Sequence, residues 1–89
     1  MPRIVITHAV VEIERWLKGT EDRAEAIGSA GGTNVTDYVA LDGSNTIAVT
    51  ADVEDPAPLK AILASPPPEV LAKMQEHGVI PPIAAYIEA

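Results

Sequence analysis

The chain has no cysteine and no phenylalanine among its 89 residues, and its aromatic residues are one tryptophan and two tyrosines. Without cysteine, disulfide bonds and thiol nucleophiles are excluded, and we expect a protein of the reducing cytoplasm. The core has to be built from Ala, Val, Ile and Leu, and a fully buried Val, Leu or Ile contributes about 1.5–3 kcal/mol. A single domain of this length, residues 1–89, is near the lower size at which a core is stable alone, so a dimer would supply further buried area.

Basic residues are also scarce. Six Lys and Arg stand against thirteen Asp and Glu, which gives a formal net charge of −7 and an isoelectric point of about 4.5. Such a surface repels phosphate groups, so we expect neither nucleic acid nor a membrane surface as a partner. No long apolar run comes before Glu12, and the N-terminus therefore predicts a strand rather than a signal peptide or a membrane span.

Apolar and β-branched residues set out a regular order of strands and helices. Strands are predicted at residues 3–10, 33–41, 46–53 and 82–88. Helices are predicted at 12–29, with a break at Gly19, and at 56–77, with a corner at 65–68. Thr20 and Asp55 are expected to cap the helical pieces that follow them. With a tight turn at 42–45 and right-handed crossovers, this order predicts an α+β fold. Its four-stranded antiparallel sheet has the strand order 4-1-3-2, with the helices on one face.

Alternation along the strands sorts their side chains onto two faces. The bulky set belongs under the helices and comprises Ile4, Ile6, Val35, Val39, Ile47, Val49, Ile83 and Ile87. The opposite set is small and uncharged and comprises Val5, Thr7, Thr36, Tyr38, Ala48, Thr50, Ala84 and Tyr86. Tyrosine is enriched and charge is depleted at protein interfaces. We therefore expect a homodimer joined sheet to sheet, with Tyr38 and Tyr86 as interface residues rather than catalytic acids.

Three segments carry a resemblance to a known superfamily: THAVVEIERWL at 7–17, DGSNTIAV at 42–49 and SPPPEVLAKMQEHGV at 65–79. With them the chain resembles the dimeric α/β-barrel superfamily, and more closely the small relatives of antibiotic-biosynthesis monooxygenases and polyketide cyclases. The resemblance implies a ferredoxin-like βαββαβ domain whose sheet pairs with that of a second copy. It also implies a pocket between sheet and helices, beneath the helix that carries Trp16. Members include cofactor-independent oxygenases, cyclases, lactone isomerases, haem-degrading enzymes and proteins without known activity, so the resemblance implies no single reaction.

His8 and Asp37 are the candidate catalytic residues. Alternation puts both on the helix-covered face at similar depth, so a direct or water-bridged contact is possible. We hypothesise that His8, oriented or kept basic by Asp37, removes a proton from a carbon next to a carbonyl, and cyclases that the chain resembles also use histidine bases. The alternatives are a buried neutral His8 bonded to a backbone carbonyl and an Asp37 open to water at a strand end.

Trp16 and His77 are the candidate ligand-binding residues. Trp16 lies on the apolar stripe of its helix, where either core packing or stacking on a ligand accounts for it. His77 comes in the last turn before Gly78, where the helix dipole favours a positive ring. The resemblance to haem-degrading relatives instead implies a haem ligand, but this chain lacks Phe and an Asn in its first strand.

The sequence contains no metal-ligand spacing and no phosphate-binding loop, so we expect no metal and no cofactor. The leading hypothesis is a dimeric, cofactor-independent cyclase, isomerase or monooxygenase that acts on a hydrophobic carbonyl or aromatic compound. The alternative is a non-catalytic module that binds a small ligand or a protein, in which His8 and Asp37 are structural. A solid core around His8 would favour this alternative, and a cavity that holds His8 would favour the enzyme.

Overall fold

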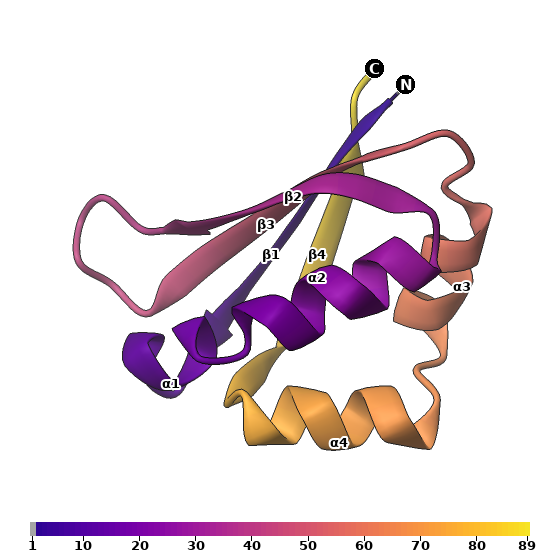
Figure 1. Ribbon diagram of the computed structural model, residues 1–89. Helices are drawn as coiled ribbons and strands as arrows, with labels where there is room; N and C mark the ends of the chain where they lie inside the picture. Colours follow the sequence, from indigo (N-terminus) through magenta and orange to yellow (C-terminus); the bar gives the residue numbers. More distant parts are fainter. Residues whose placement is uncertain (1) are drawn as a thin grey trace.

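A four-stranded antiparallel sheet organises the computed structural model, which describes residues 2–89 (Figure 1). The strands are β1 (Arg3–Val10), β2 (Gly32–Val39), β3 (Thr46–Val53) and β4 (Val79–Ile87). Their order in the sheet is β2-β3-β1-β4, which confirms the predicted order 4-1-3-2. The first and last strands are antiparallel neighbours, so the start of β1 and the end of β4 lie side by side.

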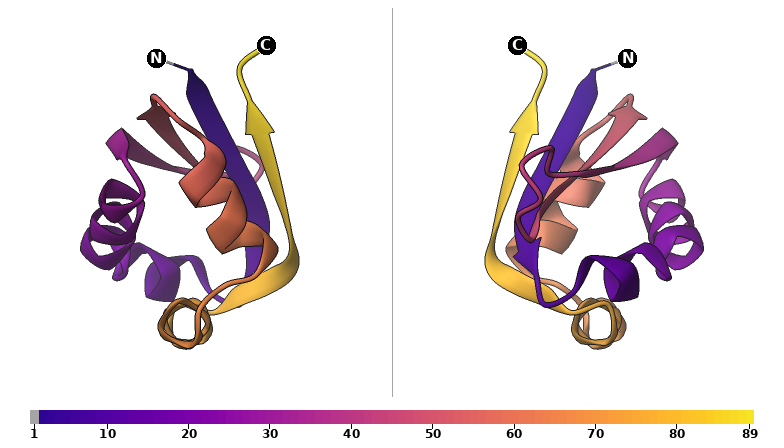
Figure 2. Two further views of the ribbon diagram at one scale, coloured as in Figure 1. Left: turned by 90° about the vertical axis from the view of Figure 1, so that its right-hand side faces the viewer. Right: turned by 90° about the vertical axis from the view of Figure 1, so that its left-hand side faces the viewer.

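All the helices lie on one face of this sheet (Figure 2). The first crossover contains α1 (Ile13–Leu17) and α2 (Thr20–Ser29), separated at Gly19 as predicted. The second contains α3 (Ala57–Ala64) and α4 (Pro68–Glu76), separated by the proline corner. Asp55 accepts a hydrogen bond from the Ala57 N–H at 3.0 Å and so caps the start of α3. The predicted cap by Thr20 is wrong, because its hydroxyl lies near the Leu17 carbonyl and the Asp37 carboxylate instead.

The last strand begins earlier than predicted, at Val79 rather than Pro82. β4 is an edge strand, where a proline can sit with its nitrogen turned away from the ladder. The pairing with β1 shifts between Thr7 and Ala9, and this irregularity carries the strand past the two prolines. The strand predicted at 82–88 therefore lacks the first residues of β4.

The register of the strands confirms the predicted division into two faces. The buried apolar residues of the core are Ile4, Ile6, Val10, Trp16, Ile27, Ala30, Ile47, Val49, Ala51, Val53 and Leu59. Most of them come from the two central strands, β1 and β3. Val39 and Ile87 lie on the helix-covered face by register, but they are 51% and 48% exposed. The prediction that helices bury these two residues is wrong because they lie at strand ends that the helices leave uncovered.

The opposite face of the sheet is lined by small side chains with a tyrosine at either edge. One row across the strands reads Tyr38, Ala48, Thr7, Ala84, and the next reads Thr36, Thr50, Val5, Tyr86. Tyr38 and Tyr86 are 47% and 62% exposed. The residues of these two rows are uncharged. Beyond them, Arg3 forms an ion pair with Asp52 at 3.1 Å and donates a hydrogen bond to the Thr50 hydroxyl at 2.9 Å.

Candidate active site

A cavity of about 400 Å³ lies between the sheet and the helices. This volume is within the range of small-molecule sites. Its floor is formed by side chains of β1, β3 and β4, namely Ile6, His8, Val49, Val79 and Ile83. Its walls are formed by residues of the helical layer, namely Trp16, Asp22, Arg23, Glu25, Ala26, Ile27, Ser29, Leu59, Ile62, Leu63, Glu69, Val70, Lys73, Met74 and His77. The exposed charged residues among these come from α2 and α4, so the mouth lies between those two helices, and the interior is mainly apolar.

His8 lies on the floor of the cavity and is 9% exposed. Its Nδ1 is 2.8 Å from the carbonyl oxygen of Ala9. A carbonyl oxygen only accepts hydrogen bonds, so Nδ1 carries the proton and Nε2 keeps its lone pair. Burial lowers the pKa of His8 below its usual 6.5, and the nearby Arg23 lowers this pKa further, against the raising effect of the Ala9 carbonyl. The imidazole is therefore neutral at pH 7.

Trp16 is fully buried and belongs both to the core cluster and to the cavity wall. Its ring meets that of His8 edge to face, with centroids 6.4 Å apart and planes at 83°. Core packing and contact with a ligand are therefore compatible for this residue. Its indole Nε1–H is buried and finds no acceptor within residues 2–89.

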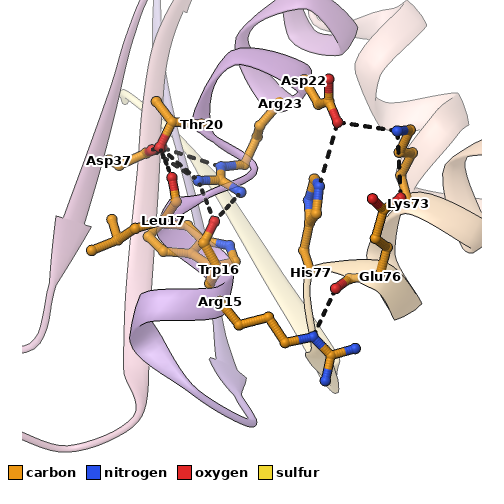
Figure 3. Close-up of polar contacts among 10 residues, drawn as sticks. All are labelled: Arg15, Trp16, Leu17, Thr20, Asp22, Arg23, Asp37, Lys73, Glu76 and His77. Carbon is orange, nitrogen blue, oxygen red and sulfur yellow. Dashed lines mark hydrogen bonds and ion pairs between the residues drawn. The ribbon is translucent and has the colours of Figure 1, made fainter.

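Asp37 is engaged by Arg23 and Thr20, not by His8 (Figure 3). Arg23 binds its carboxylate with two nitrogens, at 3.2 and 2.8 Å, and the Thr20 hydroxyl is 2.8 Å away. The Asp37 side chain is only 11% exposed, so the alternative of a strand-end residue open to water is also wrong. A direct contact with His8 is excluded by the register: Asp37 lies opposite Val49, which lies opposite Ile6, so His8 is one pair further along the sheet.

Arg23 is the residue of this site that the sequence analysis missed. Its guanidinium carbon lies 3.8 Å from the centroid of the Trp16 ring, and two of its nitrogens are each 3.2 Å from the Trp16 carbonyl oxygen. Arg23 thus joins Asp37 to Trp16. The sequence did contain an indication of this role for Arg23. A carboxylate on the covered face of a strand needs a cation as partner, and Arg23 is the one basic residue of α2.

His77 follows the last turn of α4 and lies at the edge of the cavity. Its ring packs against the backbone of Gly19, and its Nε2 is 3.8 Å from a carboxylate oxygen of Asp22. Burial and Arg23 lower its pKa more than Glu76 and Asp22 raise it, so the ring is neutral at pH 7. The predicted role of a positive ring at the helix end is therefore wrong. A ring packed on Gly19 with Nε2 toward Asp22 also does not suit a haem ligand.

Two further features bear on function. Within residues 2–89, no three His, Asp or Glu side chains are grouped closely enough to hold a metal ion. Over the same residues, none of the helices has both the length and the apolar character needed to cross a membrane.

Comparison with solved structures finds the same arrangement across the whole chain. A crystal structure of an antibiotic biosynthesis monooxygenase matches with a TM-score of 0.65 and 11% identity, over 100% of this chain and 97% of that one. A protein from Nitrosomonas europaea, provisionally named an antibiotic biosynthesis monooxygenase, matches with a TM-score of 0.64 and 13% identity, over 98% and 88% of the two chains. The chain therefore has the fold of these two structures.

A third structure with the same fold is described as a dimeric ferredoxin-like protein from an uncultured marine organism. It matches with a TM-score of 0.63 and 10% identity, over 100% of this chain and 93% of that one. Models of known protein families and the sequences of curated proteins gave no match. At these identities the comparisons establish the ferredoxin-like fold, and activity has to be argued from the site.

Proposed function

We propose that the cavity is an active site in which His8 removes a proton from a carbon next to the carbonyl group of a hydrophobic substrate. The observation that carries the proposal is the neutral imidazole of His8 on the floor of an apolar cavity, with its Nδ1 committed to the Ala9 carbonyl. In this step the C–H bond breaks, the proton goes to Nε2, and the electron pair moves onto the carbonyl oxygen to give an enolate. The ring then becomes an imidazolium that can return the proton.

The enolate accounts for the three reaction types that the sequence suggests. Return of the proton to another carbon is an isomerisation, and attack of the enolate on a second carbonyl is a cyclisation. With O2 as co-substrate, a C–O bond forms at the enolate carbon and loss of water converts CH2 into C=O. The names of the structural neighbours, both antibiotic biosynthesis monooxygenases, support this third outcome. None of these steps requires a group beyond the chain, its substrate and O2.

The functional unit in this proposal is a homodimer joined through the open face of the sheet. Small side chains next to one another on that face, Ala48, Thr7 and Ala84, leave room for the tyrosines of a second copy. Tyr38 and Tyr86 stand at opposite edges of two adjacent rows, an arrangement that lets two identical faces interlock about a two-fold axis. One structural neighbour is itself described as dimeric.

Hydrogen–deuterium exchange of a model ketone tests the role of His8. The probe is 2-tetralone, a bicyclic ketone with an acidic CH2 between its aromatic ring and its carbonyl. We expect the protein to accelerate loss of the C1 proton signal in D2O, and His8→Gln to lower the protein-dependent rate by about 10²-fold or more. Ala72→Lys, on the exposed part of α4 and outside the cavity lining, serves as the control and should retain the exchange activity.

Two outcomes would overturn the proposed reaction. One is equal exchange by the wild-type protein and a folded His8→Gln variant, which would exclude His8 as the base. The other is binding of 2-tetralone without any acceleration of exchange. That second result would favour the non-catalytic alternative, a small-ligand-binding protein in which His8 is part of the wall.

A further inference from the structure

The buried indole N–H of Trp16 is a hydrogen-bond donor that the fold leaves unused. Trp16 has no exposed surface, and its Nε1 has no acceptor among residues 2–89. A buried donor without a partner is costly, and such groups in native proteins have a partner in water, in an ion or in a ligand. Trp16 is one of the residues that line the cavity, so a small movement of its neighbours would let an oxygen atom of a molecule inside the cavity accept this hydrogen bond.

Arg23 and Asp37 hold this indole in place and strengthen it as a donor. The guanidinium of Arg23 covers one face of the ring at 3.8 Å, and a cation over an aromatic face draws electron density toward itself. The N–H at the edge of the ring then becomes more polar. The carboxylate of Asp37 fixes the guanidinium through two hydrogen bonds, as Figure 3 shows. Arg23 and Asp37 are therefore positioning residues in this arrangement.

The neighbouring ring supplies the complementary group. His8 and Trp16 meet edge to face with centroids 6.4 Å apart, and both line the same cavity. His8 offers an acceptor at Nε2, whereas Trp16 offers a donor at Nε1. In an enolisable ketone, the oxygen that accepts a hydrogen bond and the carbon that carries the acidic hydrogen are only two bonds apart. One small ligand can therefore engage both rings.

We infer that the indole N–H of Trp16 donates a hydrogen bond to the carbonyl oxygen of the ligand while His8 faces the acidic C–H of the same molecule. The inference rests on the proposed function for the class of ligand, a hydrophobic ketone with a C–H next to its carbonyl. A donor in this position also stabilises the negative charge that develops on the oxygen when the proton leaves, as in an oxyanion hole. Trp16 thus selects ketones over hydrocarbons of the same shape.

The single tryptophan makes the test direct, because the protein has one indole N–H signal in a ¹H–¹⁵N correlation spectrum. We expect 2-tetralone to shift this signal downfield, whereas tetralin, which has the same ring system without the oxygen, leaves it nearly unchanged. Trp16→Phe should weaken binding of 2-tetralone about five- to tenfold, the effect of one net hydrogen bond, and leave the affinity for tetralin within twofold. Asp37→Asn should reduce the preference for the ketone over the hydrocarbon.

Equal shifts of the indole signal with both ligands would overturn the inference, as would a Trp16→Phe variant that keeps the full preference for the ketone. An indole signal that 2-tetralone leaves in place although the ketone binds would mean that only cavity water accepts this hydrogen bond, and it would overturn the inference as well. The His8→Gln variant separates the two proposals. Suppose that 2-tetralone still shifts the indole signal of the His8→Gln variant, and that the wild-type protein does not accelerate exchange. Proton removal by His8 would then be excluded, and the role of Trp16 would stand.

Discussion

The imidazole of His77 occupies the space that a Cβ atom on Gly19 would need. This contact joins the end of α4 to the junction between α1 and α2. Arg15 reinforces it with hydrogen bonds to the carbonyl oxygens of Glu76 and Gln75, at 2.8 and 2.6 Å. No residue of α4 is buried, so these contacts at its C-terminal end hold the helix beside the mouth of the cavity.

Gly19→Ala should therefore destabilise the protein, by about 1–3 kcal/mol, because the new methyl group forces the His77 ring out of its place. Chemical denaturation monitored by Trp16 fluorescence or circular dichroism measures this free energy. Gly28→Ala is the matched control, since a Cβ there meets nothing within 4 Å and lies inside α2. This control should be neutral or stabilising by up to about 1 kcal/mol. Equal effects of the two substitutions would contradict the packing of His77 on Gly19.

The ion pair between Arg23 and Asp37 should contribute more to stability than any other in the described chain. Its side chains are 12% and 11% exposed, and its shortest contact is 2.8 Å. Asp37→Asn leaves a guanidinium in a covered site without its counter-charge, and we expect a loss of about 3 kcal/mol in the free energy of unfolding.

The exposed pair between Lys73 and Asp22, at 3.1 Å, is the control for this prediction. Asp22→Asn should cost much less than Asp37→Asn, because solvent screens an exposed pair. Urea unfolding of both variants provides the comparison. A loss at Asp37 no larger than the loss at Asp22 would show that the buried pair does not anchor this part of the fold.

Stability should fall as the pH decreases from 7 toward 5. The pKa values of His8 and His77 are both lowered in the folded protein from the usual 6.5, chiefly by burial. The unfolded chain therefore binds protons more readily than the folded one just below pH 6.5, and each histidine contributes a slope of at most about 1.4 kcal/mol per pH unit. Above pH 7 both states are neutral at these residues and the contribution is flat.

Urea titrations at several pH values measure this dependence. His8→Gln should make the slope between pH 7 and pH 5 shallower than in the wild-type protein, and His8→Gln combined with His77→Gln should make it shallower still. A wild-type protein that becomes more stable over this interval as the pH falls, with His8→Gln removing the gain, would mean that His8 is stabilised in its charged form.

Thr7→Lys tests the proposed dimer. Thr7 lies at the centre of the open face, between Ala48 and Ala84 in the sheet, so two-fold pairing would bury two new charges close together. We expect the wild-type protein to sediment as a dimer and the variant to shift toward the monomer by at least 10²-fold in dissociation constant. Ala72→Lys, the same added charge on the exposed part of α4, should remain dimeric. A monomeric wild-type protein would contradict the sheet-to-sheet pairing.

The sheet could be predicted almost completely from the sequence because its determinants are local patterns and one general rule of chain topology. Alternation of apolar residues fixed the faces, the turn at residues 42–45 fixed the hairpin, and crossover handedness fixed the strand order. The start of β4 could not be read in the same way. Pro81 and Pro82 are ordinarily strand breakers, and only the edge position of this strand, a tertiary property, makes them acceptable.

The candidate site was predicted less well, because its contacts depend on register and on helix placement. His8 and Asp37 share a face, but the sequence alone does not fix the pairing of β2 with β3 that separates them by one row. Arg23 reaches Asp37 from α2, and its packing on Trp16 depends on how that helix lies across the sheet. Residue types along a strand predict which side chains share a face, whereas partners across layers require the structure.

The protonation state of His8 is the measurement that tests the account most directly, because it needs no substrate. ¹⁵N NMR of the imidazole at pH 7 should show a neutral ring with its proton on Nδ1 and a lone pair on Nε2, titrating below the usual 6.5. A charged ring at pH 7, or a neutral ring with its proton on Nε2, would leave no base facing the cavity and would contradict the proposed function.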